Sequence, residues 1–80
     1  MNLTTEKQGF VYIIHAIGTN QIKVGYSTSP HERLKTLQTG SAIPLKMLAC
    51  WPGTMERERR VHRYLQQFRQ IGEWFTAPPF

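Results

Sequence analysis

The sequence is poor in cysteine, in acidic residues and in long apolar runs, and each shortage excludes a class of protein. A single cysteine, Cys50, allows no disulfide framework and no thiolate metal cluster within the chain, and it favours a reducing compartment. No apolar run approaches the ~20 residues of a membrane span, and the opening MNLTTEKQ contains no apolar signal region. We therefore expect a soluble, cytoplasmic protein that contacts no membrane, with Cys50 as a small apolar strand residue.

The shortage of acidic residues leaves the chain strongly basic. Five acidic residues face 10 lysines and arginines, which gives a net charge of +5 over 80 residues. This charge favours a polyanionic partner such as nucleic acid, although a solvated helix face explains basic residues equally well. Length and composition predict one small domain, residues 1–80, with its folded core at about 9–75.

Runs of β-branched and aromatic residues predict three strands along the chain, at 9–17, 22–27 and 44–51. The turn residues GTNQ separate the first two strands, which we expect to form a hairpin. One helix is expected after the second strand and another after the third, and the segment beyond Gly72 is expected to be irregular or short. This ββαβα order predicts an α+β domain: a small three-stranded, mainly antiparallel sheet flanked by helices.

The first helix is expected to run from Pro30 to about Gln38. Ser29, Pro30 and Glu32 have the pattern of an N-cap, a first helical position and the acidic residue of a capping box. Gly40 is suited to end the helix, because glycine is common just beyond a helix C-terminus.

The hairpin places several reactive side chains on one face. Because side chains alternate along a strand, Tyr12 shares a face with Lys23, Gly25 and Ser27, opposite most of the apolar residues of both strands. Ile14 lies on the Tyr12 face too, so part of that face is expected to be covered. This group has the composition of a site, although a tyrosine packed on a lysine stem is also a common surface arrangement. Arg33 lies in the first turn of the following helix, where free N–H groups attract anions. A phosphate could therefore contact Arg33 and Lys23 together.

The second helix, expected at 55–69 and capped by Thr54, carries a carboxylate on its inner side. An apolar stripe at helical spacing must face the sheet, and its members are Val61, Leu65 and Phe68. Extending the stripe by three residues reaches Glu58, whereas Glu56 points elsewhere. His62 follows Glu58 by four residues, so the two are neighbours on the helix.

An inward carboxylate is unusual unless it has a partner. For Glu58 the sequence leaves two kinds of partner open. One is a salt bridge to Arg33 or Lys23, and the other is a metal ion such as Mg²⁺, which prefers oxygen ligands.

With these features together, the sequence resembles the GIY-YIG endonuclease superfamily, in particular the phage-type branch whose domains end in a GEWF-like motif. The resemblance covers about residues 9–75. The matching segments, in chain order, are FVY at 10–12 for GIY, KVG at 23–25 for YIG, Ser27 and Arg33 for the serine and arginine that follow, Glu58 with His62 for E-x-x-x-H, and GEWF at 72–75. The chain departs from the pattern where Lys23 replaces the second tyrosine, and no asparagine occurs near the end of the domain.

The resemblance implies a metal-dependent DNA endonuclease that hydrolyses phosphodiester bonds with one Mg²⁺ or Mn²⁺ ion held by Glu58. Tyr12 would act as the base for the attacking water, with Lys23 on the same face to favour its ionised form. Arg33 would stabilise the negative charge of the transition state. Gly25 would let the DNA backbone approach the sheet closely.

Further residues are expected at the edge of this site. His62 is expected to support the site and not to bind the metal. The expected contacts to nucleic acid, besides Gly25, are Ser27, His31, Arg59 and Arg63. The alternative function is a catalytically inactive basic module of the same fold that binds nucleic acid or a protein. A third option, a small RNA-binding or ribosome-associated protein, is supported by the charge alone. The sequence leaves open the oligomeric state and a specificity domain or partner outside this chain.

Overall fold

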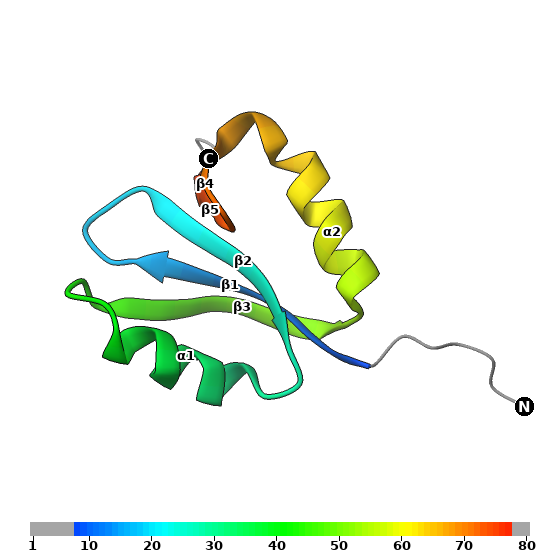
Figure 1. Ribbon diagram of the computed structural model, residues 1–80, viewed down its shortest axis with the longest axis horizontal. Helices are drawn as coiled ribbons and strands as arrows, with labels where there is room; N and C mark the ends of the chain where they lie inside the picture. The colour runs from blue at the N-terminus through cyan, green and yellow to red at the C-terminus, as the bar shows by residue number, and fades with distance from the viewer. Residues whose placement is uncertain (1–7, 78–80) are drawn as a thin grey trace, which may run out of the picture.

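The computed structural model describes residues 8–77, and its elements follow the expected order with two further strands at the C-terminal end (Figure 1). The elements are β1 (Gly9–Ala16), β2 (Gln21–Ser27), α1 (Pro30–Thr39), β3 (Leu45–Gly53), α2 (Met55–Tyr64), the short 3-10 helix η1 (Gln66–Phe68), β4 (Arg69–Ile71) and β5 (Trp74–Thr76). The α+β class is confirmed.

Within residues 8–77 the sheet has five strands in the order β3-β1-β2-β5-β4, and every neighbouring pair is antiparallel. The prediction of three strands was therefore wrong. Gly72, at a φ of 55°, turns the chain between β4 and β5, and β5 then pairs with the first residues of β2. Each added strand is only three residues long. Strands this short show too little alternation of apolar and polar residues to be recognised in a sequence.

The second helix is also shorter than predicted, because it ends at Tyr64 and not at residue 69. The chain then tightens into η1, which places Phe68 against the hydrophobic core. The glutamines and the arginine between residues 66 and 70 have high helix propensity. The sequence therefore predicted a helix beyond the residue at which the helix ends.

Both helices begin where the sequence predicted, but their caps differ. At α2, the Thr54 hydroxyl accepts a hydrogen bond from the Arg57 backbone N–H at 3.4 Å, as expected for an N-cap. At α1, the described residues contain no hydrogen bond from the Ser29 side chain to the helix. The Ser27 hydroxyl instead accepts from the Ser29 backbone N–H at 2.9 Å, so the predicted capping box is not formed.

The two helices lie on opposite sides of the sheet (Figure 1). On the α2 side, the core consists of Val11, Ile22, Val24, Leu65 and Phe75, with Val61 and Phe68 packed against it. On the α1 side, Tyr12 is 1% exposed, and its cross-strand partner is Gly25. Ile14, paired with Lys23, is fully buried on the same side. The predicted division of the hairpin into two faces is confirmed.

The structure corrects the prediction for Cys50. The residue lies in β3, as expected, but this strand forms an edge of the sheet and its even-numbered residues are exposed. Cys50 is therefore an exposed thiol and not a packed apolar residue. Among residues 8–77, no helix is long and apolar enough to cross a membrane.

Candidate functional site

Two glutamates in the first turn of α2 have different environments. Glu58 is 8% exposed and faces the sheet in line with the apolar stripe of the helix. Glu56 has a side chain that is 40% exposed, and its carboxylate lies 3.8 Å from the Arg63 guanidinium. The predicted inward position of Glu58 is confirmed, and Glu56 serves as its natural control.

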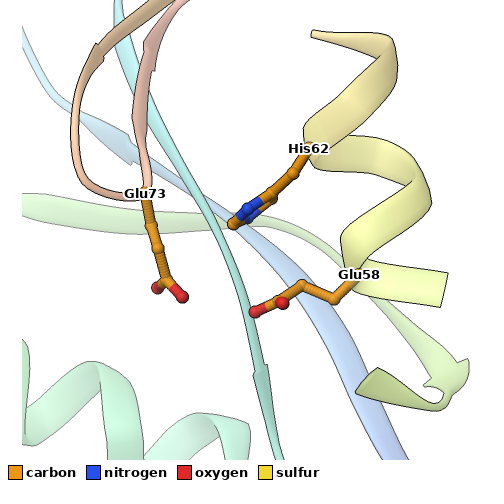
Figure 2. A group of neighbouring side chains, drawn as sticks. All are labelled: Glu58, His62 and Glu73. Atoms are coloured by element: carbon orange, nitrogen blue, oxygen red, sulfur yellow. The ribbon is translucent and has the colours of Figure 1, made fainter. Parts of the chain in front are cut away.

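Glu58 lies beside two further groups that can bind a metal. The donor atoms of Glu58, His62 and Glu73 all lie within 4.8 Å of one another. Figure 2 shows that Glu58 and His62 extend from α2, whereas Glu73 approaches from the turn between β4 and β5. We call these three residues the Glu–His–Glu cluster.

Lys23 connects the cluster to the second strand. Its ammonium lies 2.8 Å from Oε1 of Glu73, and the lysine is only 7% exposed. The same ammonium lies 6.0 Å from the centre of the Trp74 ring. Within the described part of the chain, no ion pair joins Glu58 to Lys23 or to Arg33. Both salt bridges considered from the sequence are therefore replaced by a Lys23–Glu73 pair next to Glu58.

His62 is held in place by the backbone of β2. Its Nε2 lies 2.8 Å from the carbonyl oxygen of Val24, and a carbonyl can only accept, so Nε2 carries the proton. In the tautomer with its proton on Nε2, Nδ1 is the nitrogen with the lone pair. The Val24 backbone N–H donates to the carbonyl oxygen of Glu73 at 3.1 Å, and the His62 ring packs edge-on against Phe75. One residue of β2 thus anchors both neighbours of Glu58.

The environment of Glu58 raises the pKa of its carboxyl group. Burial is the largest cause, and the negative charge of Glu73 and a hydrogen bond between the two side chains add to it. His62 and Arg59 act in the opposite direction. Two carboxylates this close are stable when a proton or a cation lies between them. The donors therefore fit a divalent cation, which would take the place of the proton.

Tyr12 lies directly against Gly25. A Cβ atom added to Gly25 would overlap the phenol ring and hydroxyl of Tyr12. The space that the DNA backbone was expected to use above Gly25 is therefore filled by the Tyr12 ring. Gly25 follows Val24 in the chain, so the Tyr12 hydroxyl lies next to the backbone segment that holds His62.

The other predicted site residues do not contact the cluster through any hydrogen bond or ion pair among the described residues. Arg33, His31, Arg59 and Arg63 are exposed, and Arg63 pairs with Glu56. Ser27 is half-buried and stabilises the turn before α1. The structure thus brings together Lys23, Glu58 and His62, and it places Arg33 at the surface.

Glu73 is the one member of the cluster that the sequence reasoning missed. The residue belongs to the GEWF segment, which was noted as a motif but given no role. A single acid between glycine and two aromatic residues was the available signal. The segment was expected to be irregular, so nothing indicated that it would pair with β2 and bring Glu73 to Glu58.

The family comparison identifies a known domain over most of the chain. The family model of the T5orf172 domain, which occurs in nuclease-like proteins of phages and bacteria, matches residues 9–79. No curated protein and no solved structure gives a significant match.

Proposed function

The chain belongs to the T5orf172 domain family, and we propose that it is a metal-dependent DNA endonuclease of the GIY-YIG type. The observation that carries the proposal is the buried carboxylate of Glu58, which is 8% exposed and faces a second carboxylate and an imidazole. A module that only binds nucleic acid needs cations and has no use for two adjacent acids, one of them buried. The net charge of +5 supports a polyanionic substrate.

Glu58 is the residue that would hold the divalent ion, Mg²⁺ or Mn²⁺. When bound, such an ion supplies positive charge that stabilises the oxygen leaving the phosphorus. Carboxylate oxygens are the ligands that both ions prefer.

The chain's own residues would carry out the remaining steps of hydrolysis. The oxygen of a water molecule attacks the phosphorus, and one bridging P–O bond breaks. Tyr12, whose ring lies against Gly25, would accept the proton of this water or orient the water through a hydrogen bond. The proton ends on the departing oxygen. Arg33 would donate hydrogen bonds to the non-bridging oxygens, on which negative charge increases in the transition state.

The alternative is a catalytically inactive basic module of the same fold that binds nucleic acid or a protein. The Lys23–Glu73 ion pair favours it, because this 2.8 Å contact already neutralises one carboxylate of the cluster. In that case the cluster would only stabilise the packing of α2 on the sheet.

The two functions are distinguished by cleavage of plasmid DNA by a matched pair of variants. Glu58→Ala should lose nearly all Mg²⁺- or Mn²⁺-dependent cleavage, since the metal loses its main ligand. Glu56→Ala should cleave like the unchanged protein, since its carboxylate points away from the cluster and pairs with Arg63 at the surface. Equal cleavage by the two folded variants would exclude the proposed role of Glu58.

A further inference from the structure

We infer that Glu58, His62 and Glu73 form a single three-residue cation site that takes Mn²⁺ in preference to Mg²⁺. This inference rests on the proposed function, since the ion bound there would be the one that serves cleavage. The proposed function names Glu58 as the metal ligand. The inference adds His62 and Glu73 as further ligands and adds a preference for Mn²⁺.

The spacing of the donors suits one ion. Metal–ligand distances of about 2.1 Å place any two ligands of one ion at most about 4.2 Å apart. The donor atoms of the Glu–His–Glu cluster already lie within 4.8 Å of one another. A small rotation of the side chains is therefore enough to bring all three onto one ion, and the backbone does not need to move.

Two of the three donors are oriented by partners outside the cluster. His62 gives its Nε2 proton to the Val24 carbonyl, so Nδ1 is the nitrogen left for a metal. Metal-binding histidines commonly donate their other N–H to a backbone carbonyl in this way. Glu73 receives Lys23 on Oε1, which leaves the second carboxylate oxygen available. The contacts with Val24 and Lys23 thus hold the two side chains in place, and each side chain keeps one further atom that can bind a metal.

The net charge of the site favours a cation. Two ionised carboxylates and the ammonium of Lys23 sum to one negative charge, counted from Glu58, Glu73 and Lys23. An added divalent cation offsets the repulsion between the two neighbouring carboxylates.

The imidazole decides which divalent ion is preferred. Mg²⁺ is bound almost entirely by oxygen and keeps several of its waters, whereas first-row transition ions also bind imidazole nitrogen. Mn²⁺ accepts carboxylate oxygen as readily as Mg²⁺ does, so a mixed set of two carboxylates and one imidazole favours Mn²⁺ over Mg²⁺.

The inference is tested by Mn²⁺ binding to the full chain, followed by electron paramagnetic resonance. In the unchanged protein, Mn²⁺ should bind at least about tenfold more tightly than Mg²⁺. Pulsed spectra should show coupling of the Mn²⁺ ion to a directly bound nitrogen. Glu58→Gln, His62→Gln and Glu73→Gln should each weaken Mn²⁺ binding at least about tenfold, and Glu56→Gln should not. His62→Gln alone should remove the nitrogen coupling.

Three results would overturn the inference. They are equal affinity for Mg²⁺ and Mn²⁺, absence of nitrogen coupling in the unchanged protein, and normal Mn²⁺ binding by His62→Gln or Glu73→Gln. The spectrum of the unchanged protein decides the role of His62 even if a variant fails to fold. Loss of binding only in Glu58→Gln would reject the three-residue site and leave the proposed endonuclease intact. Cleavage that continues in a chelator would reject the proposed endonuclease itself.

Discussion

The proposed reaction needs two regions of the molecule that differ in almost every physical respect. The Glu–His–Glu cluster is assembled from α2 and the β4–β5 turn, and each of its side chains has a partner within the protein. The first turn of α1 is formed by consecutive residues, and there Arg33 is exposed and forms no ion pair with any residue between 8 and 77. The cluster is therefore organised by contacts within the protein, whereas in the proposed reaction a phosphate of the substrate would orient Arg33.

This difference determines what a substitution can reveal in each region. A buried carboxylate costs free energy unless it is paired, so changes in the cluster should alter stability and metal binding as well as cleavage. An exposed arginine is well hydrated and costs little when unpaired, so its role should appear in cleavage alone. A cluster substitution that leaves stability unchanged, or an Arg33 substitution that lowers stability, would contradict this distinction.

Arg33→Ala should produce the largest effect outside the cluster. Losing one donor that stabilises transition-state charge should lower the cleavage rate about 10²- to 10³-fold, with thermal stability unchanged because the side chain is exposed. Lys35→Ala is the control, since Lys35 lies in the same helix and pairs only weakly with Glu32 at 3.4 Å. Similar rates for the two variants would remove Arg33 from the mechanism.

Gly25→Ala should damage both stability and cleavage, because the new Cβ overlaps the buried Tyr12 ring. Such overpacking costs about 1–3 kcal/mol of unfolding free energy. Gly9→Ala is the matched variant, since its Cβ would lie 2.6 Å from the Tyr26 hydroxyl oxygen. Tyr26 is only partly buried and can yield, so this second change should cost less. Urea denaturation measures the unfolding free energy of both variants. A larger loss of stability in Gly9→Ala than in Gly25→Ala would contradict the close packing of Tyr12 on Gly25.

Glu58→Gln should stabilise the metal-free protein near neutral pH. Folding raises the pKa of Glu58 above its usual value of 4.5, chiefly through burial. The folded state therefore binds the proton more tightly than the unfolded state, so ionised Glu58 lowers stability at pH values above the raised pKa. The stability advantage of the Glu58→Gln variant over the unchanged protein should grow from below pH 4.5 upward, as thermal denaturation in a chelator would show. A lower stability of Glu58→Gln than of the unchanged protein at neutral pH would refute the assignment.

Cys50→Ala should have the smallest effect. The thiol is exposed on the edge strand β3, so its loss should change the unfolding free energy by no more than about 0.5 kcal/mol and leave cleavage intact. A substantial loss of cleavage by the folded variant would require a role for the thiol that its position does not indicate.

The parts of the fold that follow from local patterns could be predicted from the sequence. Alternation along β1 and β2 placed Tyr12 and Lys23 on one face, and the register of the hairpin agrees. Helical spacing in α2 separated Glu58 from Glu56, because a two-residue step turns a side chain to another side of the helix. Both patterns extend over enough residues to be read without knowledge of the rest of the chain.

The parts that depend on contacts between distant residues could not be predicted. Strands β4 and β5 are too short to show a pattern, and the pairing of β5 with β2 joins them to the sheet. The position of Glu73 follows from that pairing, and so does its contact with Lys23, 50 positions away in the chain. The His62 ring is fixed by the backbone carbonyl of Val24. Every residue has such a carbonyl, so the sequence does not indicate which one the ring will contact. Sequence reasoning therefore found the side of the site carried by α2 and missed the side carried by the β4–β5 turn.

The most direct test of the whole account is cleavage of a supercoiled plasmid by the unchanged protein, with and without divalent cations. We predict nicked or linear DNA in Mn²⁺ or Mg²⁺ and intact DNA in a chelator, because the buried carboxylate of Glu58 needs the cation to act. Activity should return when the cation is restored. Cleavage that persists in the chelator would contradict the metal-dependent mechanism, and DNA binding without cleavage under every cation would show an inactive binding module.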